Sequence, residues 1–307
     1  MKKLIYLFAI IMGLGLMSCE DPIDVTLESS IPQLTVDAWI TNETKVQTVR
    51  LTVSQDYFSN TFNPDALNAT VTLTDITANE NYSFTDADND GNYTYDASGE
   101  AIAKLNHEYQ LTVVFDGNTF ISTTNVNRTM PIDSVGIEYR EGGLGEPEGH
   151  YASLYARDSV GFGDFYWIRT YKWDQADNQG FWLNKPSEIN ISADGTFSPN
   201  ARNDNIELFE FILPIRDLVN PVSDPDGPDD IPPYEIGDSL YVELHGISEG
   251  SYYYLLEIQT ATLNGGLFAT PLNNVPTNIA NADPNSTVTA IGWFGMSMVN
   301  AMGRKVE

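Results

Sequence analysis

Apolar and polar residues alternate in short runs along most of the chain. In the clearest run, Leu34, Val36, Ala38 and Ile40 fall on one side and polar residues and a tryptophan on the other. A period of two is typical of strands with one buried face. Further runs, separated by Asn, Asp and Gly, occupy residues 46–53, 69–76, 81–85, 93–96, 109–115 and 119–126. Seven short strands within about 95 residues predict an antiparallel sandwich.

The second half of the chain shows the same alternation, interrupted once. Strand-like runs occupy residues 134–139, 152–157, 165–173, 206–213, 239–245 and 287–299. Before the last run, Ser248 is a good N-cap and Asn264-Gly265 a strong stop signal, so we expect one helix over about residues 248–264. The pattern therefore predicts a mainly β protein with one helix near the C-terminus.

Met130-Pro131 marks the expected boundary between two sandwich domains, because proline ends strands. We expect an N-terminal β-sandwich over residues 33–129 and a C-terminal β-rich domain over residues 130–307. Residues 69–75, 89–93 and 109–113 read ATVTLTD, NDGNY and YQLTV and resemble a transthyretin-like or carboxypeptidase-regulatory-like sandwich. The first domain is therefore expected to be immunoglobulin- or transthyretin-like. Such modules are often structural spacers, and the resemblance therefore implies no activity.

The first nineteen residues predict a lipoprotein signal. Lys2 and Lys3 precede an apolar run over residues 4–16, which ends in Leu16-Met17-Ser18-Cys19. A run this short, at about 1.5 Å per residue, does not cross a hydrocarbon core of about 30 Å, so residues 1–18 are expected to be a signal peptide. The end of the run resembles a bacterial lipobox, in which Cys19 is acylated and becomes the first mature residue. The alternative is an ordinary cleaved signal with a cysteine nearby by chance.

Residues 19–32 form the expected acidic tether. Glu20, Asp21 and Asp24 follow the cysteine and resemble a surface-export signal of Bacteroidota lipoproteins. The alternative is a solvated tether whose acidic residues do not direct export. We expect an outer-membrane protein that is lipid-anchored through Cys19 and exposed at the cell surface.

The charge and the cysteine content exclude several partners. The chain has 43 acidic and 15 basic residues and a net charge of −28, and removal of Lys2 and Lys3 with the signal gives −28 − 2 = −30. So acidic a chain has no excess of cations for a nucleic-acid backbone or for anionic lipid headgroups. A single cysteine also excludes a disulfide framework and a multi-cysteine zinc site.

Four segments in a fixed order resemble one family. They are residues 19–25, 34–41, 130–135 and 291–294, which read CEDPIDV, LTVDAWIT, MPIDSV and IGWF. Together they resemble the Bacteroidota lipoprotein family catalogued as domain of unknown function forty-two forty-nine. The resemblance implies a periplasm-to-surface lipoprotein whose genes often lie beside TonB-dependent outer-membrane transporters. The family pattern contains no catalytic residues.

An aromatic cluster is the candidate ligand-binding site. Alternation puts Trp167, Arg169, Tyr171 and Trp173 on one face of a strand, and Trp182 follows shortly after. An exposed face of this composition is a stacking platform with a hydrogen-bonding cation, which suits sugars, peptides or aromatic ligands. The alternative is that these rings are core, in which case Arg169 needs a buried partner.

An acidic turn is a weak candidate calcium site. Asp86, Asp88, Asp90 and Gly91 match the first half of a calcium loop. The twelfth position holds Ala97 instead of the bidentate glutamate, and Asp96 is the neighbouring substitute. The alternative is a solvated hairpin turn. A second acidic stretch, residues 224–230, lies among prolines and is expected to be an acidic loop.

Ser248 lies in Gly246-Ile247-Ser248-Glu249-Gly250, which matches the G-x-S-x-G nucleophile elbow. Hydrolases of that class place the catalytic histidine after the serine, whereas His107, His150 and His245 all precede it. Ser248 as a helix N-cap explains the match, so we expect no enzyme.

These observations favour a non-enzymatic outer-membrane lipoprotein, an accessory or substrate-capture component beside a TonB-dependent transporter. The first alternative is a structural or adhesive surface module without a soluble ligand, and a hydrolase is the remote one. The expected cofactors are none beyond the covalent lipid on Cys19 and weakly bound calcium.

Overall fold

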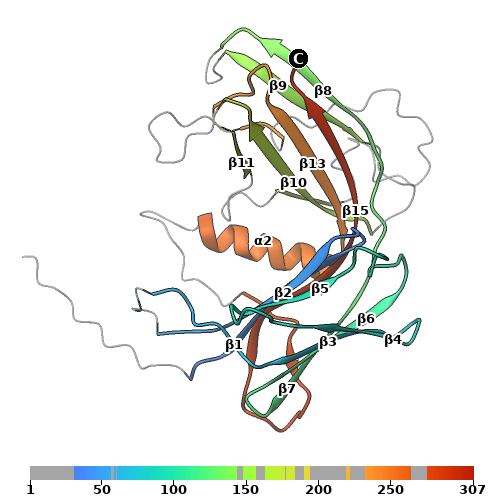
Figure 1. The fold of residues 1–307 in the computed structure, drawn as a ribbon, viewed down its shortest axis with the longest axis vertical. Coiled ribbons are helices and arrows are strands. Elements are labelled where there is room, and N and C mark those ends of the chain that lie inside the picture. The colour runs from blue at the N-terminus through green and yellow to red at the C-terminus, as the bar shows by residue number, and fades with distance from the viewer. Residues whose placement is uncertain are drawn as a thin grey trace, which may run out of the picture.

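The computed structural model describes residues 31–56, 59, 61–143, 148–156, 163–176, 178–183, 190–193, 219–221, 232–263 and 275–307. The signal peptide, Cys19, most of the tether, the expected strand over residues 206–213 and the acidic loop over residues 224–230 lie outside the described residues. The described chain is mainly β with a helix near the C-terminus, which confirms the predicted fold class (Figure 1).

The first seven strands fall where the alternation predicts them. They are β1 (Leu34–Thr41), β2 (Val46–Val53), β3 (Thr70–Asp75), β4 (Glu80–Phe84), β5 (Asn92–Asp96), β6 (Glu108–Phe115) and β7 (Asn118–Asn125). The turn between β6 and β7 places Asp116 and Gly117 at φ angles of 46° and 73°. Two successive positive φ angles are what a tight two-residue hairpin turn requires.

The second half adds further strands, most of them also predicted. The predicted ones are β8 (Ile132–Arg140), β9 (Gly149–Ala156), β10 (Phe165–Asp174), β13 (Ser239–Ile247) and β15 (Ala290–Lys305). Three others were not expected: β11 (Gln179–Trp182), β12 (Asn190–Ala193) and β14 (Ala280–Asn281). Strands this short leave too few residues for a period of two to be recognised.

One sheet runs through both halves of the molecule, in the order β11-β10-β13-β15-β1-β2-β5, with β12 also paired to β10. The 16-residue strand β15 joins the halves. Its residues 290–297 pair in parallel with β1, and its residues 298–305 pair antiparallel with β13. The expected division at residue 130 stays a prediction, but the hydrogen bonds show that the C-terminal strand continues the sheet of the N-terminal half.

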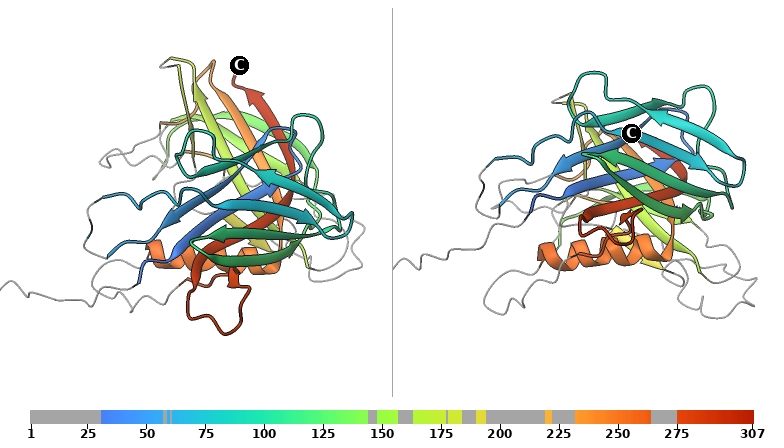
Figure 2. Two further views of the ribbon diagram at one scale, coloured as in Figure 1. Left: turned by 60° about the horizontal axis from the view of Figure 1, so that its bottom comes forward. Right: turned by 90° about the horizontal axis from the view of Figure 1, so that it is seen from below.

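Two separate layers cover the same face of this long sheet. A five-stranded sheet, β14-β7-β6-β3-β4, packs over β1, β2 and the beginning of β15, and the β8–β9 hairpin packs over β10 and β13 (Figure 2). Val36 and Ile40 lie in the first core, and Ile168 and Leu244 in the second. Each core therefore takes alternate residues from a continuous sheet.

Residues 127–130 link the two covering layers across the sheet. Asn127 donates from Nδ2 to the Ile247 carbonyl at 3.1 Å, and Thr129 donates from Oγ1 to the Leu244 carbonyl at 2.9 Å. The absence of a side chain at Gly246 leaves room for the Arg128 backbone. The segment that the sequence marks as a boundary is thus fastened to β13.

The helix α2 (Glu249–Leu263) lies on the opposite face of the long sheet (Figures 1 and 2). It begins as predicted, because Ser248 accepts a hydrogen bond at Oγ from the Ser251 amide at 3.1 Å, as an N-cap does. Phe165 of β10 packs against Tyr252 of α2, with 5.2 Å between ring centres. Within the described residues, no helix combines the length and apolar character that crossing a membrane requires.

Candidate functional site

The aromatic strand β10 has two faces with opposite surroundings. On the even face, Tyr166, Ile168, Thr170 and Lys172 are fully buried. The odd face is half-buried along most of the strand and exposed at Trp173. The even face is therefore the core, and the odd face is a partly open surface. Ligand binding at that surface stays a prediction.

We call Trp167, Arg169, Tyr171, Trp173 and Trp182 the Arg169 shelf. The guanidinium carbon of Arg169 lies 4.2 Å from the ring centre of Trp182 and 5.1 Å from that of Trp167. The ring of Tyr171 meets that of Trp182 edge-on, with 5.1 Å between centres. Trp182 and Trp173 keep 37% and 39% of their surface exposed. The structure thus brings four of the five predicted residues into contact, with Trp173 at the end of the group.

A buried polar network lies beside the shelf on the same face. Glu243 of β13 is directly opposite Arg169, with 3.6 Å between Oε2 and Nη1. The same oxygen lies 3.1 Å from Nε2 of His245, and Lys45 Nζ lies 4.0 Å from Oε1. Nδ1 of His245 lies 3.1 Å from the Ser297 hydroxyl of β15. The network therefore connects the shelf to the strand that joins both halves of the sheet.

Glu243 is the ionised member of this network. Burial alone raises the pKa of its carboxyl group, but the hydrogen bond from His245 and the charges of Arg169 and Lys45 outweigh burial and hold the pKa below its ordinary value. Burial lowers the pKa of His245 by more than Glu243 raises it, so the imidazole is neutral at pH 7. Because a carboxylate only accepts hydrogen bonds, Nε2 carries the proton and Nδ1 accepts from Ser297.

Ser297, His245 and Glu243 have the connectivity of a hydrolase triad, in which a hydroxyl contacts an imidazole that contacts a carboxylate. All three side chains are buried, at 2%, 4% and 3% exposure. The ring of Trp167 also lies against His245, with 5.4 Å between centres. A substrate carbonyl has no access to the Ser297 hydroxyl in this arrangement. The network accordingly holds the sheet together instead of presenting a nucleophile.

The helix α2 covers the neighbouring part of this face with more aromatic residues. Tyr254 stacks on Trp293 at 4.6 Å, and Trp293 donates from Nε1 to the Ser251 hydroxyl at 3.0 Å. Trp39 of β1 connects the helix to the shelf, since its ring lies 6.5 Å from Tyr254 and 5.1 Å from Trp167. The shelf is thus the uncovered end of an aromatic row that begins under α2.

The predicted calcium turn gathers three of its four residues. Carboxylate oxygens of Asp86, Asp88 and Asp90 lie within 4.8 Å of one another, and Asp96 is not in the group. Asp86 accepts hydrogen bonds from the amides of Asp90 and Gly91, both at 3.1 Å. The backbone and side-chain nitrogens of Asn92 donate to Asp90, and these hydrogen bonds lower the pKa of that carboxyl group. Two of the three carboxylates therefore already hold the turn.

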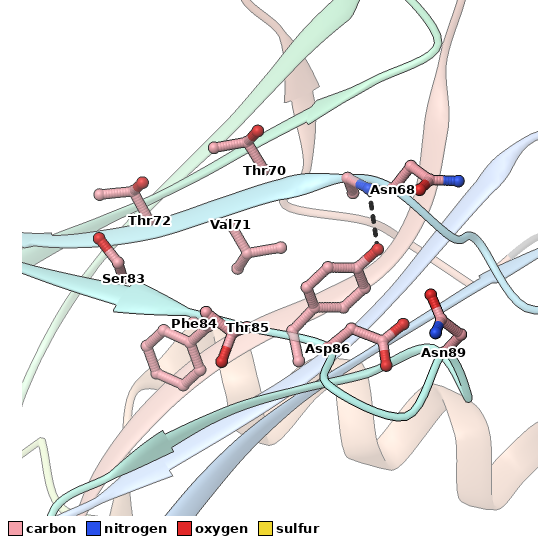
Figure 3. A pocket seen from close by; sticks show the side chains of 11 residues that line it. Asn68, Thr70, Val71, Thr72, Ser83, Phe84, Thr85, Asp86 and Asn89 are labelled. Atoms are coloured by element: carbon pink, nitrogen blue, oxygen red, sulfur yellow. Dashed lines mark hydrogen bonds between the residues drawn. The ribbon is translucent and has the colours of Figure 1, made fainter.

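A cavity of about 380 Å³ opens beside this turn (Figure 3). It lies where β3 and β4 diverge beyond the pair formed by Val71 and Phe84. The Tyr93 hydroxyl of β5 holds the segment before β3, accepting from the Ala69 amide and donating to the Ala66 carbonyl, both at 2.8 Å. The rim carries polar side chains from Asn68, Thr70, Ser83, Thr85 and Asn89. The cavity contains none of the residues of the shelf.

Residues 20–301 match the profile of a family described as Domain of unknown function (DUF4249). The chain belongs to this family. The match confirms the family that the ordered motifs of the sequence resemble, and it covers both halves of the sheet. No curated protein matches the chain.

Two solved structures show distant similarity to this DUF4249 chain. The crystal structure of the chicken interferon gamma receptor alpha chain is 10% identical, covers 72% of this chain and 90% of its own, and has a TM-score of 0.18. A structure concerned with host cell surface retention of a bacterial ice-binding adhesin is 10% identical and has a TM-score of 0.19. The match covers 92% of this chain and 66% of the adhesin chain. Scores this low carry no argument about fold or function.

Two features of the site were missed from the sequence. Lys172 is fully buried, and its Nζ donates to the carbonyls of Pro232 and Pro233 at 2.9 and 3.1 Å and lies 3.3 Å from an Asp238 oxygen. The alternation placed Lys172 on the even face without revealing that this face is the core. The Glu243 network was also missed, although Glu243 and His245 share a face of a predicted strand, because nothing local in the sequence connects them to Ser297.

Proposed function

We propose that this DUF4249 chain is a non-enzymatic outer-membrane lipoprotein that captures a small molecule beside a TonB-dependent transporter. The lipobox-like end of the signal, Leu16 to Cys19, supports a covalent lipid anchor. The acidic residues after Cys19 support export to the cell surface. The family resemblance supports the transporter as the partner, because the family's genes often lie beside such transporters.

The Arg169 shelf carries the binding part of the proposal. Trp182 is more than one-third exposed and is stacked by a guanidinium at 4.2 Å. A core residue gains its stability from full burial, whereas a partly exposed ring fixed in one orientation gains less. Oriented aromatic and charged side chains on a partly open surface are typical of binding sites. We infer that the ligand completes the burial of Trp182.

Pulldown of the native lipoprotein from outer membranes tests the capture role. We expect a TonB-dependent transporter to co-purify with the wild-type protein and with the Trp182→Ala variant, and a bound small molecule to co-purify with the wild-type protein only. Phe62→Ala is the matched control, because Phe62 is a fully exposed aromatic residue away from the shelf. Recovery of neither transporter nor small molecule from the wild-type protein would contradict the proposal.

The anchor is tested separately by mass spectrometry of the mature N-terminus. We expect an acylated Cys19 as the first residue, and loss of membrane attachment in the Cys19→Ser variant. Protease treatment of intact cells should cleave the wild-type protein if it lies on the outer surface. An unmodified thiol at Cys19, or a mature terminus further along the chain, would overturn the proposed localisation.

One observation favours a structural or adhesive surface module as the second candidate. The cavity of about 380 Å³ lies between β3 and β4, whereas the shelf is an open surface. An open aromatic surface also suits contact with another macromolecule. Gene deletion separates the two roles: loss of uptake through the neighbouring transporter supports capture, and unchanged uptake with altered cell adhesion supports the module.

A further inference from the structure

We infer that the Arg169 shelf binds an organic anion, with a carboxylate or a similarly acceptor-rich group on Arg169 and a flat apolar part on Trp182. This inference rests on the proposed capture function and names the class of ligand. Its basis is the hydrogen-bonding capacity that the shelf leaves unused.

Arg169 is the first group with unused capacity. Its guanidinium has five N–H donors in a planar fork. Among the described residues it makes two stacking contacts and one ion pair, and the Glu243 oxygen of that pair is 3.6 Å away, which is too long for a hydrogen bond. The side chain is also 31% exposed, so solvent and ligand have access to it. Stacking on Trp182 fixes the plane of the fork but satisfies none of its donors.

Trp167 supplies the second unused donor. Its Nε1 atom is buried and has no hydrogen-bond partner among the described residues. Buried indole N–H groups usually find a partner, because an unsatisfied donor costs free energy. The Arg169 guanidinium lies 5.1 Å from the ring of Trp167. Two residues in contact with each other therefore carry donors that lack acceptors in the described part of the chain.

The carboxylate and the imidazole beside the shelf, in contrast, are already engaged. Glu243 accepts from His245 at Oε2, and Oε1 faces Lys45 at 4.0 Å. His245 uses its remaining nitrogen to contact Ser297. A neutral sugar needs acceptors as well as donors from its site, whereas the exposed guanidinium of Arg169 offers donors only. A ligand that brings acceptors and negative charge matches what the shelf offers.

Two cations lie beside the shelf of an otherwise acidic chain. The whole chain has 15 basic residues against 43 acidic ones, so most of its surface repels anions. Arg169 and Lys45 nevertheless approach the same carboxylate from two elements, β10 and the turn after β1. Lys45 is 56% exposed at the rim of the network, but its Nζ pairs with Oε2 of Glu43 at 2.7 Å, so the cation open to a ligand is Arg169.

The apolar part of the ligand is expected to lie on Trp182. Tyr171 stands edge-on to that ring, and Tyr241, which pairs with Tyr171 across the β10–β13 register, is 38% exposed. These rings form a wall beside the guanidinium. A planar hydrophobic group laid on Trp182 with its carboxylate turned toward Arg169 would use both features.

Two matched probe pairs test this assignment on the full-length lipoprotein in detergent. The pairs are 2-naphthoate with 2-naphthamide and indole-3-acetate with indole-3-acetamide, which differ in charge but little in shape. We expect calorimetric titration to show at least about tenfold tighter binding of a carboxylate than of its amide, as charge-assisted hydrogen bonds allow. Arg169→Gln should reduce carboxylate affinity to that of the amide and leave amide affinity unchanged.

Arg140→Gln is the matched control, since Arg140 also stacks on a ring, that of Tyr151 at 5.2 Å, but lies on the β8–β9 hairpin. It should leave carboxylate binding unchanged. Equal affinity for carboxylate and amide, or a wild-type affinity in Arg169→Gln, would overturn the anion assignment while small-molecule capture stands. Binding of none of the four probes would overturn both the assignment and the capture function at this shelf.

Discussion

The Arg169 shelf and the Asp86 turn both concentrate chemically capable side chains, but they differ in what those side chains are doing. At the turn, the carboxylates of Asp86 and Asp90 accept hydrogen bonds from nitrogens of the same turn. At the shelf, the donors of Arg169 and of Trp167 Nε1 lack acceptors among the described residues. Residue type alone marked both regions. The two regions therefore differ in how much of their hydrogen-bonding capacity is used: the turn is self-contained, and the shelf has donors to spare.

The largest expected effect comes from removing the charge that supports the shelf. Glu243→Gln leaves Arg169 without the carboxylate charge that lies 3.6 Å from Nη1, and it weakens the hydrogen bond to His245. Because hydrogen bonds and ion pairs of buried charged groups are costly to lose, we expect the free energy of unfolding to fall by about 2 to 3 kcal/mol in urea denaturation. Glu43→Gln, at a pair with Lys45 in which the two side chains are 23% and 56% exposed, should cost less than about 1 kcal/mol.

The difference in the free energy of unfolding between wild type and Glu243→Gln should depend on pH. The pKa of Glu243 is lowered in the folded state, so its stabilisation is fully present above the ordinary glutamate value of 4.5 and is lost as pH falls through the folded pKa. Wild type and Glu243→Gln should therefore differ most near neutral pH and converge in acid. A difference that stays constant between neutral and acidic pH would show that Glu243 is not the charged support of the shelf.

A smaller effect is expected at the turn. Asp86→Ala removes the acceptor for the Asp90 and Gly91 amides, and we expect a loss of about 1 to 2 kcal/mol in the free energy of unfolding. Asp88→Ala is the matched control, because Asp88 is exposed and makes no hydrogen bond within the described chain; its effect should stay within about 0.5 kcal/mol. Equal effects of the two substitutions would remove the contrast between turn and shelf.

Calcium should add little to the stability of a turn whose carboxylates already accept hydrogen bonds from nitrogens of the same turn. The site lacks the bidentate glutamate, so we expect a Kd in the millimolar range, and about 10 mM calcium would then stabilise the fold by about 1.4 kcal/mol or less. Thermal unfolding with and without calcium measures this. A micromolar Kd by calorimetry would show that the carboxylates reorganise around the ion and that the turn is a calcium site.

The smallest expected effect comes from removing the unpartnered indole donor of the shelf. Trp167→Phe removes the unpartnered Nε1 donor and keeps an aromatic ring at that position. Removal of an unsatisfied buried donor offsets part of the lost packing, so we expect a change in the free energy of unfolding within about 1 kcal/mol, in either direction, by urea denaturation. A loss of several kcal/mol would show that the indole nitrogen has a partner, and the contrast with the turn would weaken.

Much of the fold follows from local patterns. The period of two identified β1 to β7 because each strand has one buried face, and Ser248 marked the beginning of α2 because its hydroxyl caps the helix. The same alternation sorted Arg169 and its aromatic neighbours onto one face of β10. These features depend on residues close together in the chain, where a sequence is most informative.

The remainder depends on contacts between distant residues. Nothing near Ala290 indicates that it will pair in parallel with Leu34, because register between strands far apart in the chain has no local signal. For the same reason the sequence did not reveal the contact between His245 and Ser297 or the full burial of Lys172. The candidate site could therefore be located from the sequence, but its hydrogen-bonding state could not.

The position of β1 has a mechanical consequence. The chain enters the fold at Leu34 and runs lengthwise between β2 and β15, with eight register pairs to β15 alone. A pull on the preceding segment, such as drag on a protein held at its N-terminus, acts along the strand axis. The bonds on both sides are then loaded in shear and must fail together, whereas a hairpin pulled from its end would unzip one pair at a time.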